Sequence, residues 1–298
     1  MQTPQLIIHF LIAATQLLAG VFANGFIVLV NIMNLIKQRK MAPLDLLISC
    51  LATSRICLQV IIFFVYLVLH FFTKQLALVE NFIILTFVNS CGLWLATWLG
   101  VFYCTKIATF PHPLFFWLKV RMPKLVPWLI LGSLLYASII TGIYGKYALT
   151  LIQRFLVHFS SKNATQTKGI DMTSFSLFII HITVPASIFL IAVLLLVFSL
   201  GRHTQQMRSI ARGMRYPIRG ALMRAMLSIL SFLILYFSHY MVIILFFSQD
   251  FQCDSFLILF CNLMAGTYPS IHSVILILGN PNLKQNAKKF LLCGQCHQ

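Results

Sequence analysis

The chain has 298 residues, of which 60% are hydrophobic and 9% charged, and its mean hydropathy is +0.91. Soluble globular domains have about 25% charged residues, so the composition excludes them and indicates an integral membrane protein. The net charge of +17 comes from basic residues in short stretches between apolar runs. That distribution fits membrane orientation better than a nucleic-acid surface, so no nucleic-acid partner is expected.

Seven apolar runs are long enough to cross a bilayer as helices, since about 20 apolar residues suffice. They predict an all-α polytopic membrane protein, a seven-helix bundle forming a single domain over residues 1–298. The spans are expected near residues 6–36, 46–72, 81–107, 125–145, 174–200, 225–247 and 256–279. The first run is too long for the apolar region of a signal peptide and should remain as an uncleaved span.

Lysine and arginine predict the orientation. With the N-terminus outside and the C-terminus inside, only five of them fall in outer segments, namely Lys74, Lys146, Arg154, Lys162 and Lys168, against sixteen inside. Such a bias follows the positive-inside rule. The Asn-x-Ser/Thr sequence at Asn163 then lies in the outer loop 146–173, where glycosylation takes place.

Two inner segments are strongly basic. The loop 201–224 contains six arginines and no acid, which is explained equally by contact with anionic lipids and by docking of a cytosolic partner. The tail 280–298 contains a short amphipathic helix, expected at residues 282–292. It ends with Cys293 and Cys296, for which palmitoylation and unmodified thiols both stay open because no redox or metal pattern surrounds them.

Arg55 is the exceptional polar residue. It stands ten residues past Asp45, about 15 Å deep by helical rise, where burying its charge costs at least about 2.5–3.5 kcal/mol. We expect it to face the bundle interior and to join Asn24 and the last helix near His272 and Ser273. A structural or switching role is favoured over ligand contact, and an arginine that reaches water or the interface is the alternative.

Other polar groups allow two readings. Pro185 and Pro269 interrupt the fifth and seventh spans, as hinges or as static kinks. If the outer halves of the helices converge, their polar residues line a small-molecule cavity, although each serves interhelical packing equally well. These residues are Asn89, Ser90, His181, His239, Tyr240 and Asn262. No spacing selects a nucleophile–base pair or metal ligands, so neither an enzyme nor a cofactor is expected.

Several long motifs occur in a fixed order along the chain. They are LATSR at residues 51–55, LWLATWLGVFYCTKIA at 93–108, HPLFFWLKVRM in the second inner loop at 112–122, SLGRHTQQM at 199–207 and YPSIHSVILILGNPNLKQ at 268–285. With these motifs the chain resembles the type 2 (bitter) taste receptors over nearly its whole length. The resemblance implies a plasma-membrane G-protein-coupled receptor. It would bind small bitter compounds, activate a gustducin-type G protein, phospholipase C-β and calcium signalling, contact membrane lipids and be a candidate for oligomerisation.

The resemblance also implies roles for particular residues. The ligand positions of the family fall on Leu85, Asn89, Ser90, His239, Tyr240, Asn262 and Ala265. The switch positions fall on Asn24, Arg55, Tyr103, Lys106, His272 and Ser273. The surface facing the G protein would include Lys119, Arg121, His203, Met207 and Arg208. Some relatives have an acid where Ser90 or Asn262 stands, which argues against a preference for cationic compounds.

The residues alone leave one other class open, a small-molecule transporter or channel. The missing internal repeats and the missing intramembrane acids count against it. Ligand-dependent flux without a G protein would favour it.

Overall fold

The protein is described by a computed structural model over residues 3–68, 75–108, 112–160, 172–210 and 255–295, together with residues 233, 234 and 237. Its helices are α1 (Thr3–Gln38), α2 (Pro43–Leu67), α3 (Gln75–Ile107), α4 (Pro113–Ser160), α5 (Met172–Ile210), α7 (Ser255–Gly279) and α8 (Pro281–Gln295). The described residues contain no strand. Within these described ranges, five helices are long and apolar enough to cross a membrane, and α7 adds the shorter apolar segment Pro269–Gly279. The predicted all-α membrane fold is therefore confirmed.

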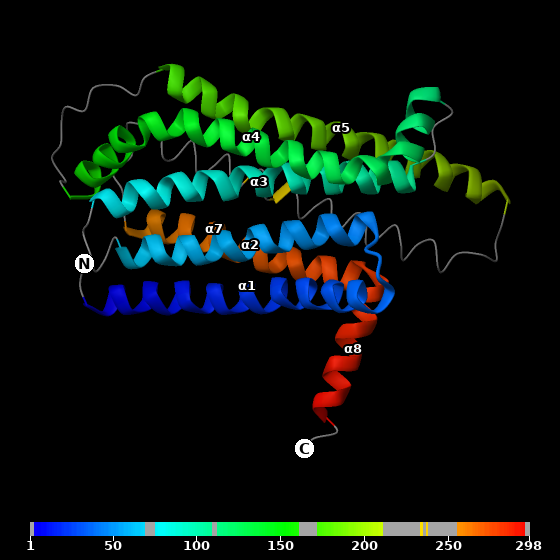
Figure 1. Cartoon of the computed structure of the whole chain (residues 1–298), viewed down its shortest axis with the longest axis horizontal. Coiled ribbons are helices and arrows are strands. Elements are labelled where there is room, and N and C mark those ends of the chain that lie inside the picture. Colours follow the sequence, from blue (N-terminus) through cyan, green and yellow to red (C-terminus); the bar gives the residue numbers. More distant parts are fainter. Residues whose placement is uncertain are drawn as a thin grey trace.

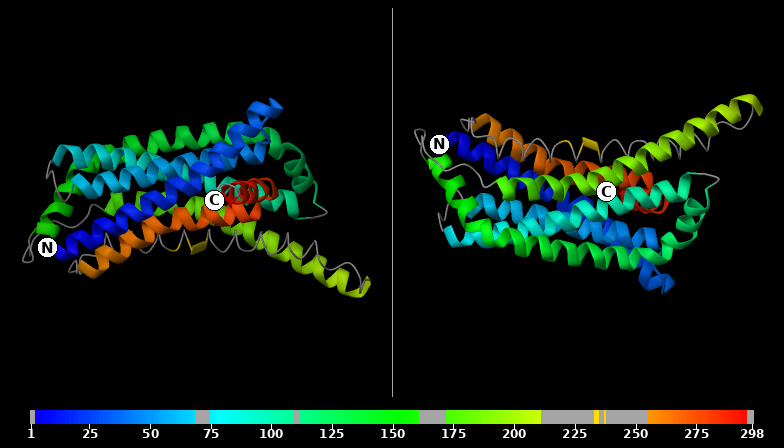
Figure 2. Two further views of the ribbon diagram at one scale, coloured as in Figure 1. Left: turned by 90° about the horizontal axis from the view of Figure 1, so that it is seen from below. Right: turned by 90° about the horizontal axis from the view of Figure 1, so that it is seen from above.

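The helices form one elongated bundle (Figures 1 and 2), in which α1, α2 and α7 lie on one side and α4 and α5 on the other. Helix α3 runs between them and packs against α2, α4 and α5, while α1 packs against α2 and α7. The core between these helices is apolar and includes Ile27, Leu51, Leu99 and Phe189. The outer faces are apolar as well, as a lipid environment requires.

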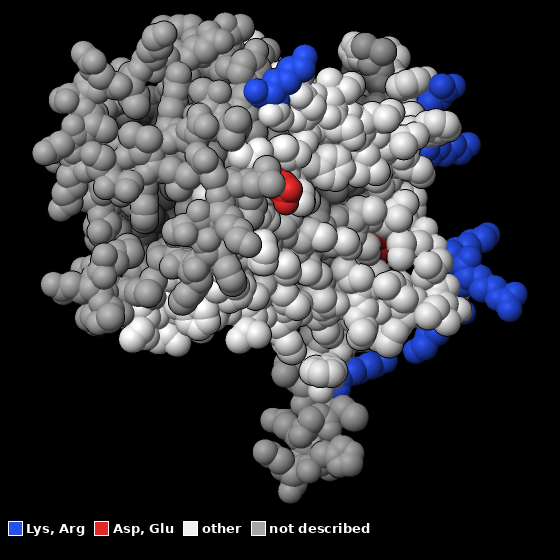
Figure 3. Space-filling model, turned by 60° about the vertical axis from the view of Figure 1, so that its left-hand side comes forward, with Lys and Arg blue, Asp and Glu red and all other residues white. Residues whose placement is uncertain are grey.

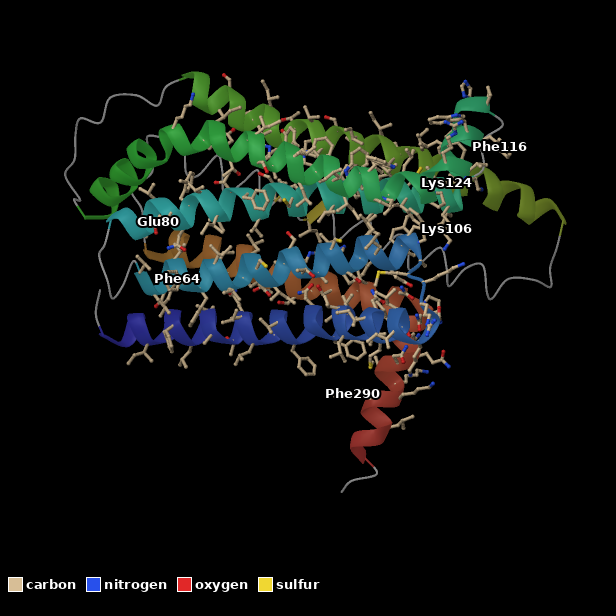
Figure 4. The ribbon with its side chains drawn as sticks, in the orientation of Figure 1. Phe64, Glu80, Lys106, Phe116, Lys124 and Phe290 are labelled. Carbon is tan, nitrogen blue, oxygen red and sulfur yellow. The ribbon has the colours of Figure 1, made fainter. Side chains whose placement is uncertain are left out.

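The two ends of the bundle differ in charge. One end, here called the α8 end, contains the last turns of α1 and α3, the start of α4, and α8 (Figure 1). Its described basic residues are Lys37, Arg39, Lys40, Lys106, Lys119, Arg121, Lys124, Lys284, Lys288 and Lys289. Figure 3 shows most of the visible basic surface gathered on that side of the molecule. In Figure 4, Lys106 and Lys124 lie at the α8 end, whereas Glu80 lies at the opposite end.

Two helices, α4 and α5, extend well beyond the apolar runs that predicted them. Helix α4 already begins at Pro113, so most of the segment 112–122, expected as a loop, is helical, and it continues through residues 146–160 of the expected outer loop. Helix α5 continues to Ile210, into the expected inner loop. Apolar content marks where a helix is in contact with lipid, whereas the helix itself ends only where its backbone hydrogen bonds end.

The junction of α7 and α8 has a clear local cause. Asn280 lies between the two helices, and its side-chain Oδ1 accepts the backbone N–H of Asn282 at 3.0 Å. This is the bond of an N-cap, and Pro281 occupies the first helical position, where a missing N–H costs nothing. Helix α8 therefore turns away from the direction of α7 and leaves the bundle beside the end of α1 (Figure 1), and its Phe290 ring packs edge-on against Phe26 of α1 at 6.3 Å.

Candidate functional site

The first polar cluster joins α1, α2 and α7 around Arg55, whose side chain is 5% exposed. Its Nη1 hydrogen-bonds His272 Nδ1 and lies 3.5 Å from Ser273 Oγ. Because a guanidinium only donates, His272 must accept through Nδ1. Ser273 Oγ donates to Asn24 Oδ1 at 2.5 Å and lies 2.7 Å from the Pro269 carbonyl oxygen. The structure thus brings together the four residues that the sequence placed at one depth.

A second polar cluster lies about one turn away on the same three helices. The Nε2 of Gln59, on α2, donates to the Gly266 carbonyl of α7 at 3.2 Å. The Nε2 of Gln16, on α1, donates to the Leu263 carbonyl of α7 at 3.0 Å. Sequence reasoning did not select either glutamine, because a single amide in an apolar run carries no spacing signal.

A third cluster surrounds Asp45 at the α8 end. Its backbone carbonyl accepts Asn31 Nδ2 at 3.2 Å and Ser49 Oγ at 2.7 Å. Its carboxylate Oδ1 lies 3.4 Å from Asn280 Nδ2, at the junction of α7 and α8. This residue therefore connects α2 with α1 and with the α7–α8 junction.

On the other side of the bundle, α3, α4 and α5 meet around His181, which is 3% exposed. Its Nε2 lies 3.2 Å from Ser90 Oγ, and its Nδ1 lies 3.1 Å from the Tyr136 hydroxyl. The Tyr136 ring stacks on the imidazole at 5.7 Å and 15°, and Trp94 packs edge-on against Tyr136 at 5.2 Å. The cluster combines a polar bridge with aromatic stacking.

The direction of these bonds follows from the serine. Ser90 donates its proton to the Thr86 carbonyl at 2.6 Å. His181 must then donate from Nε2 to Ser90 and accept through Nδ1 from Tyr136. A serine nucleophile needs the opposite arrangement, with the imidazole accepting the serine proton. The contact is therefore a structural bridge between helices, and it does not activate the serine.

Two further contacts tie α3 to its neighbours. The Thr97 hydroxyl lies 2.9 Å from the Leu93 carbonyl and 3.4 Å from the carbonyl of Pro185, the proline inside α5. Trp98 Nε1 donates to Ser133 Oγ of α4 at 3.1 Å. Helix α3 is thus fixed to α4 and to the proline-containing turn of α5.

The remaining predicted residues are distributed along the bundle. Leu85 and Asn89 lie half-buried on α3 near Ser90, and Tyr103 and Lys106 lie in the last turns of α3. By backbone position, Asn262 and Ala265 belong to α7, Lys119 and Arg121 to α4, His203, Met207 and Arg208 to α5, and Cys293 to α8. Asn163, His239, Tyr240 and Cys296 lie outside the described residues.

The chemistry of these clusters is that of binding and conformational change. Their members are amides, hydroxyls, imidazoles, one guanidinium and the Asp45 carboxylate on facing helices, and they exchange hydrogen bonds. Within the part of the chain that the structure describes, no three His, Cys, Asp or Glu side chains are grouped to hold a metal ion.

Comparison with known proteins identifies the family. The family model described as taste receptor protein (TAS2R) matches residues 1–295. Taste receptor type 2 member 1 of Pan paniscus is 57% identical over 297 residues, which cover 98% of each chain. Taste receptor type 2 member 119 of Mus musculus is 49% identical over 298 residues, covering 100% of this chain and 89% of the relative. Taste receptor type 2 member 41 of Rattus norvegicus is 34% identical over 284 residues, covering 93% and 92%.

The matches agree with the motifs and with the helical membrane fold, and they favour a receptor over a transporter or channel. The chain belongs to the type 2 taste receptor family, and it is a multi-pass membrane receptor for bitter taste that signals through G proteins rather than an enzyme.

Proposed function

We propose that the receptor lies in the plasma membrane with its N-terminus outside and its α8 end in the cytosol. The support is the charge difference between the two ends of the bundle (Figure 3). Short cytosolic segments of membrane proteins are enriched in lysine and arginine, and α8 carries Lys284, Lys288 and Lys289. In this orientation Asn163 would be available for glycosylation, and Cys293 and Cys296 would be at the cytosolic surface, where palmitoylation takes place.

Bitter agonists would bind in the half of the bundle opposite the α8 end. The observation that carries this assignment is the polar bridge of Ser90, His181 and Tyr136, which joins three helices next to Asn89. Ser90 itself is fully buried against His181, so it would shape the site, whereas half-buried Asn89 and Leu85 would contact the ligand. The other proposed contacts are His239, Tyr240, Asn262 and Ala265.

The basic α8 end would face a gustducin-type G protein, which activates phospholipase C-β and releases calcium. Lys119 and Arg121 support this assignment, because they lie at the start of α4 beside the end of α3, with Lys119 Nζ 3.5 Å from the Ala108 carbonyl. We assign His203, Met207 and Arg208 to the same surface, because the backbone of α5 continues through them beyond its apolar span. An agonist would act by binding more tightly to the conformation that admits the G protein.

The test is calcium mobilisation in cells that express the receptor with a gustducin-type chimeric Gα, screened with a panel of bitter compounds. We expect a response that requires the Gα. Asn89→Ala and His239→Ala should each raise the half-maximal agonist concentration about tenfold. This change corresponds to the loss of one hydrogen bond to the agonist that contributes about 1 kcal/mol or slightly more. Surface expression should stay normal.

Ser138→Ala is the matched control, because that exposed hydroxyl bonds only to the Leu134 carbonyl within α4. Unchanged dose–response curves for both variants would refute the ligand assignment. A receptor that reaches the surface and stays silent to the whole panel would count against the proposed coupling. Ligand-dependent flux in vesicles without a G protein would then be measured.

A further inference from the structure

Helix α7 carries a proline in its interior, Pro269. A proline lacks the N–H that would donate to the carbonyl four residues earlier, so a helix bends more easily at that point. The bend of such a helix therefore depends on the contacts that neighbouring helices make with it. In the described part of the bundle, α7 packs mainly against α1 and to a smaller extent against α2, with α8 attached to its end.

Both of these neighbours donate amide hydrogens to the turns of α7 around the proline. Gln59 of α2 donates from Nε2 to the Gly266 carbonyl at 3.2 Å and to Ser270 Oγ at 3.0 Å. Gln16 of α1 donates from Nε2 to the Leu263 carbonyl at 3.0 Å and to Thr267 Oγ1 at 2.9 Å. Gln59 is 3% exposed, so its amide makes these bonds inside the bundle.

Each glutamine occupies space that a glycine leaves open. A Cβ atom at Gly20 of α1 would lie 1.7 Å from Gln59 Oε1 and 2.1 Å from its Cδ. A Cβ atom at Gly266 of α7 would lie 2.2 Å from Gln16 Oε1. No real pair of atoms approaches so closely, so an alanine at either position displaces the glutamine amide. Close approach of this kind is what small residues permit between membrane helices.

Gly20 also links this cluster to the Arg55 cluster. Its carbonyl accepts Asn24 Nδ2 at 2.9 Å, and Asn24 in turn receives the hydroxyl of Ser273. Ser273 lies 2.7 Å from the carbonyl of Pro269. Polar side chains of α1 and α2 therefore hold α7 on both sides of its proline.

We propose that Gln59, which packs against Gly20, and Gln16, which packs against Gly266, are positioning residues of receptor activation. They hold α7 at Pro269 in the resting conformation, and their release raises the share of receptors that signal without agonist. A restraint at a hinge acts in this way because its loss increases the population of the other hinge conformations.

The decisive experiment compares Gly20→Ala with Gln59→Ala by basal inositol phosphate formation, divided by the number of receptors at the cell surface. Each variant should raise this ratio at least threefold. The double variant Gly20→Ala/Gln59→Ala should equal Gln59→Ala alone, because the added methyl group then finds the space empty. Gly266→Ala should raise the ratio through Gln16 in the same way. A merely structural defect would lower surface expression and leave the ratio unchanged.

Gly25→Ala is the matched control on the same helix, since a Cβ atom there meets nothing within 4 Å. An unchanged or lower ratio in Gly20→Ala, or effects that simply add in the double variant, would overturn the inference. The readout rests on the G-protein coupling proposed above. A wild-type receptor that is silent to every agonist counts against that proposal, whereas a responding wild type with unchanged variants counts against this one.

Discussion

The two sides of the bundle are held together by different interactions. Between α1, α2 and α7, amides and a guanidinium bond to carbonyls and hydroxyls beside a proline, as Gln59 does to Gly266. Between α3, α4 and α5, rings stack around a histidine, as Tyr136 does on His181. Side-chain bonds to the backbone around Pro269 restrain the bending of α7, whereas the stacked rings around His181 mainly fill the space between helices. Changes on the first side should therefore alter signalling, and changes on the second side should alter stability and agonist response.

The largest effect is expected from Arg55→Ala. The variant removes the donor to His272 and Ser273, and a buried polar group that loses its partner costs about 1–3 kcal/mol. We expect the maximal response per surface receptor to fall at least tenfold, while the order of agonist potencies stays the same. Thr53→Ala is the control, because that exposed hydroxyl bonds only to the Ser49 carbonyl of its own helix. Normal signalling from Arg55→Ala would refute the role assigned to the first side.

Gly100→Ala tests the packing of the second side. A Cβ atom at Gly100 would lie 2.4 Å from the ring of Phe189, which is fully buried between α3 and α5. Overpacking of this kind costs about 1–3 kcal/mol, so the midpoint of thermal inactivation in detergent should fall clearly. Gly132→Ala, where the new methyl group meets nothing within 4 Å, should leave the midpoint unchanged or raise it. Equal midpoints for the two variants would mean that Phe189 moves aside freely.

His181→Phe keeps a ring for Tyr136 to stack on and removes the bonds to Ser90 and Tyr136. Each bond contributes about 1 kcal/mol to holding the three helices together, and only part of that energy acts on the neighbouring agonist site, so agonist potency should fall about three- to tenfold. Basal signalling should stay at the wild-type level. The measurement is a dose–response curve beside an agonist-free control. Raised basal signalling with unchanged potency would erase the distinction between the two sides.

Trp98→Phe should have the smallest effect. It removes the bond from Trp98 Nε1 to Ser133, which contributes about 0.5–1.5 kcal/mol, and keeps most of the apolar area. The thermal midpoint should fall by less than in Gly100→Ala. Trp128→Phe is the control, because Trp128 is 70% exposed on the outer face of α4. A larger loss in Trp128→Phe would show that contacts on that outer face matter more than the bond inside.

Some of this arrangement could be predicted from sequence and some could not. The helical membrane fold followed from apolar run length, and Arg55 was noticed because a charge inside a span is costly. Counting helical rise placed Asn24, His272 and Ser273 at similar depth, and the structure has them in contact. Depth along a helix is thus readable from the sequence.

Rotation about the helix axis was not readable. Because the spans are apolar all round, no periodicity indicated that Gln59 faces α7 or that Tyr136 faces His181. The sequence also did not show which glycines have a side chain packed against them. Gly20 and Gly25 look alike in sequence, but of these two only Gly20 has a described side chain within reach of an added Cβ atom. The full length of α4 and α5 was missed because composition reports contact with lipid and not the course of the backbone.

The length of α5 has a practical consequence for imaging this small receptor. Its apolar span is Ile179–Ser199, yet the helix continues to Ile210, about 16 Å farther at 1.5 Å per residue. A soluble carrier protein joined in helical register at Ile210 would therefore turn together with the part of α5 that follows Pro185. Such a carrier would serve as a fiducial mark for particle alignment in electron cryomicroscopy, and its tilt would report the tilt of α5.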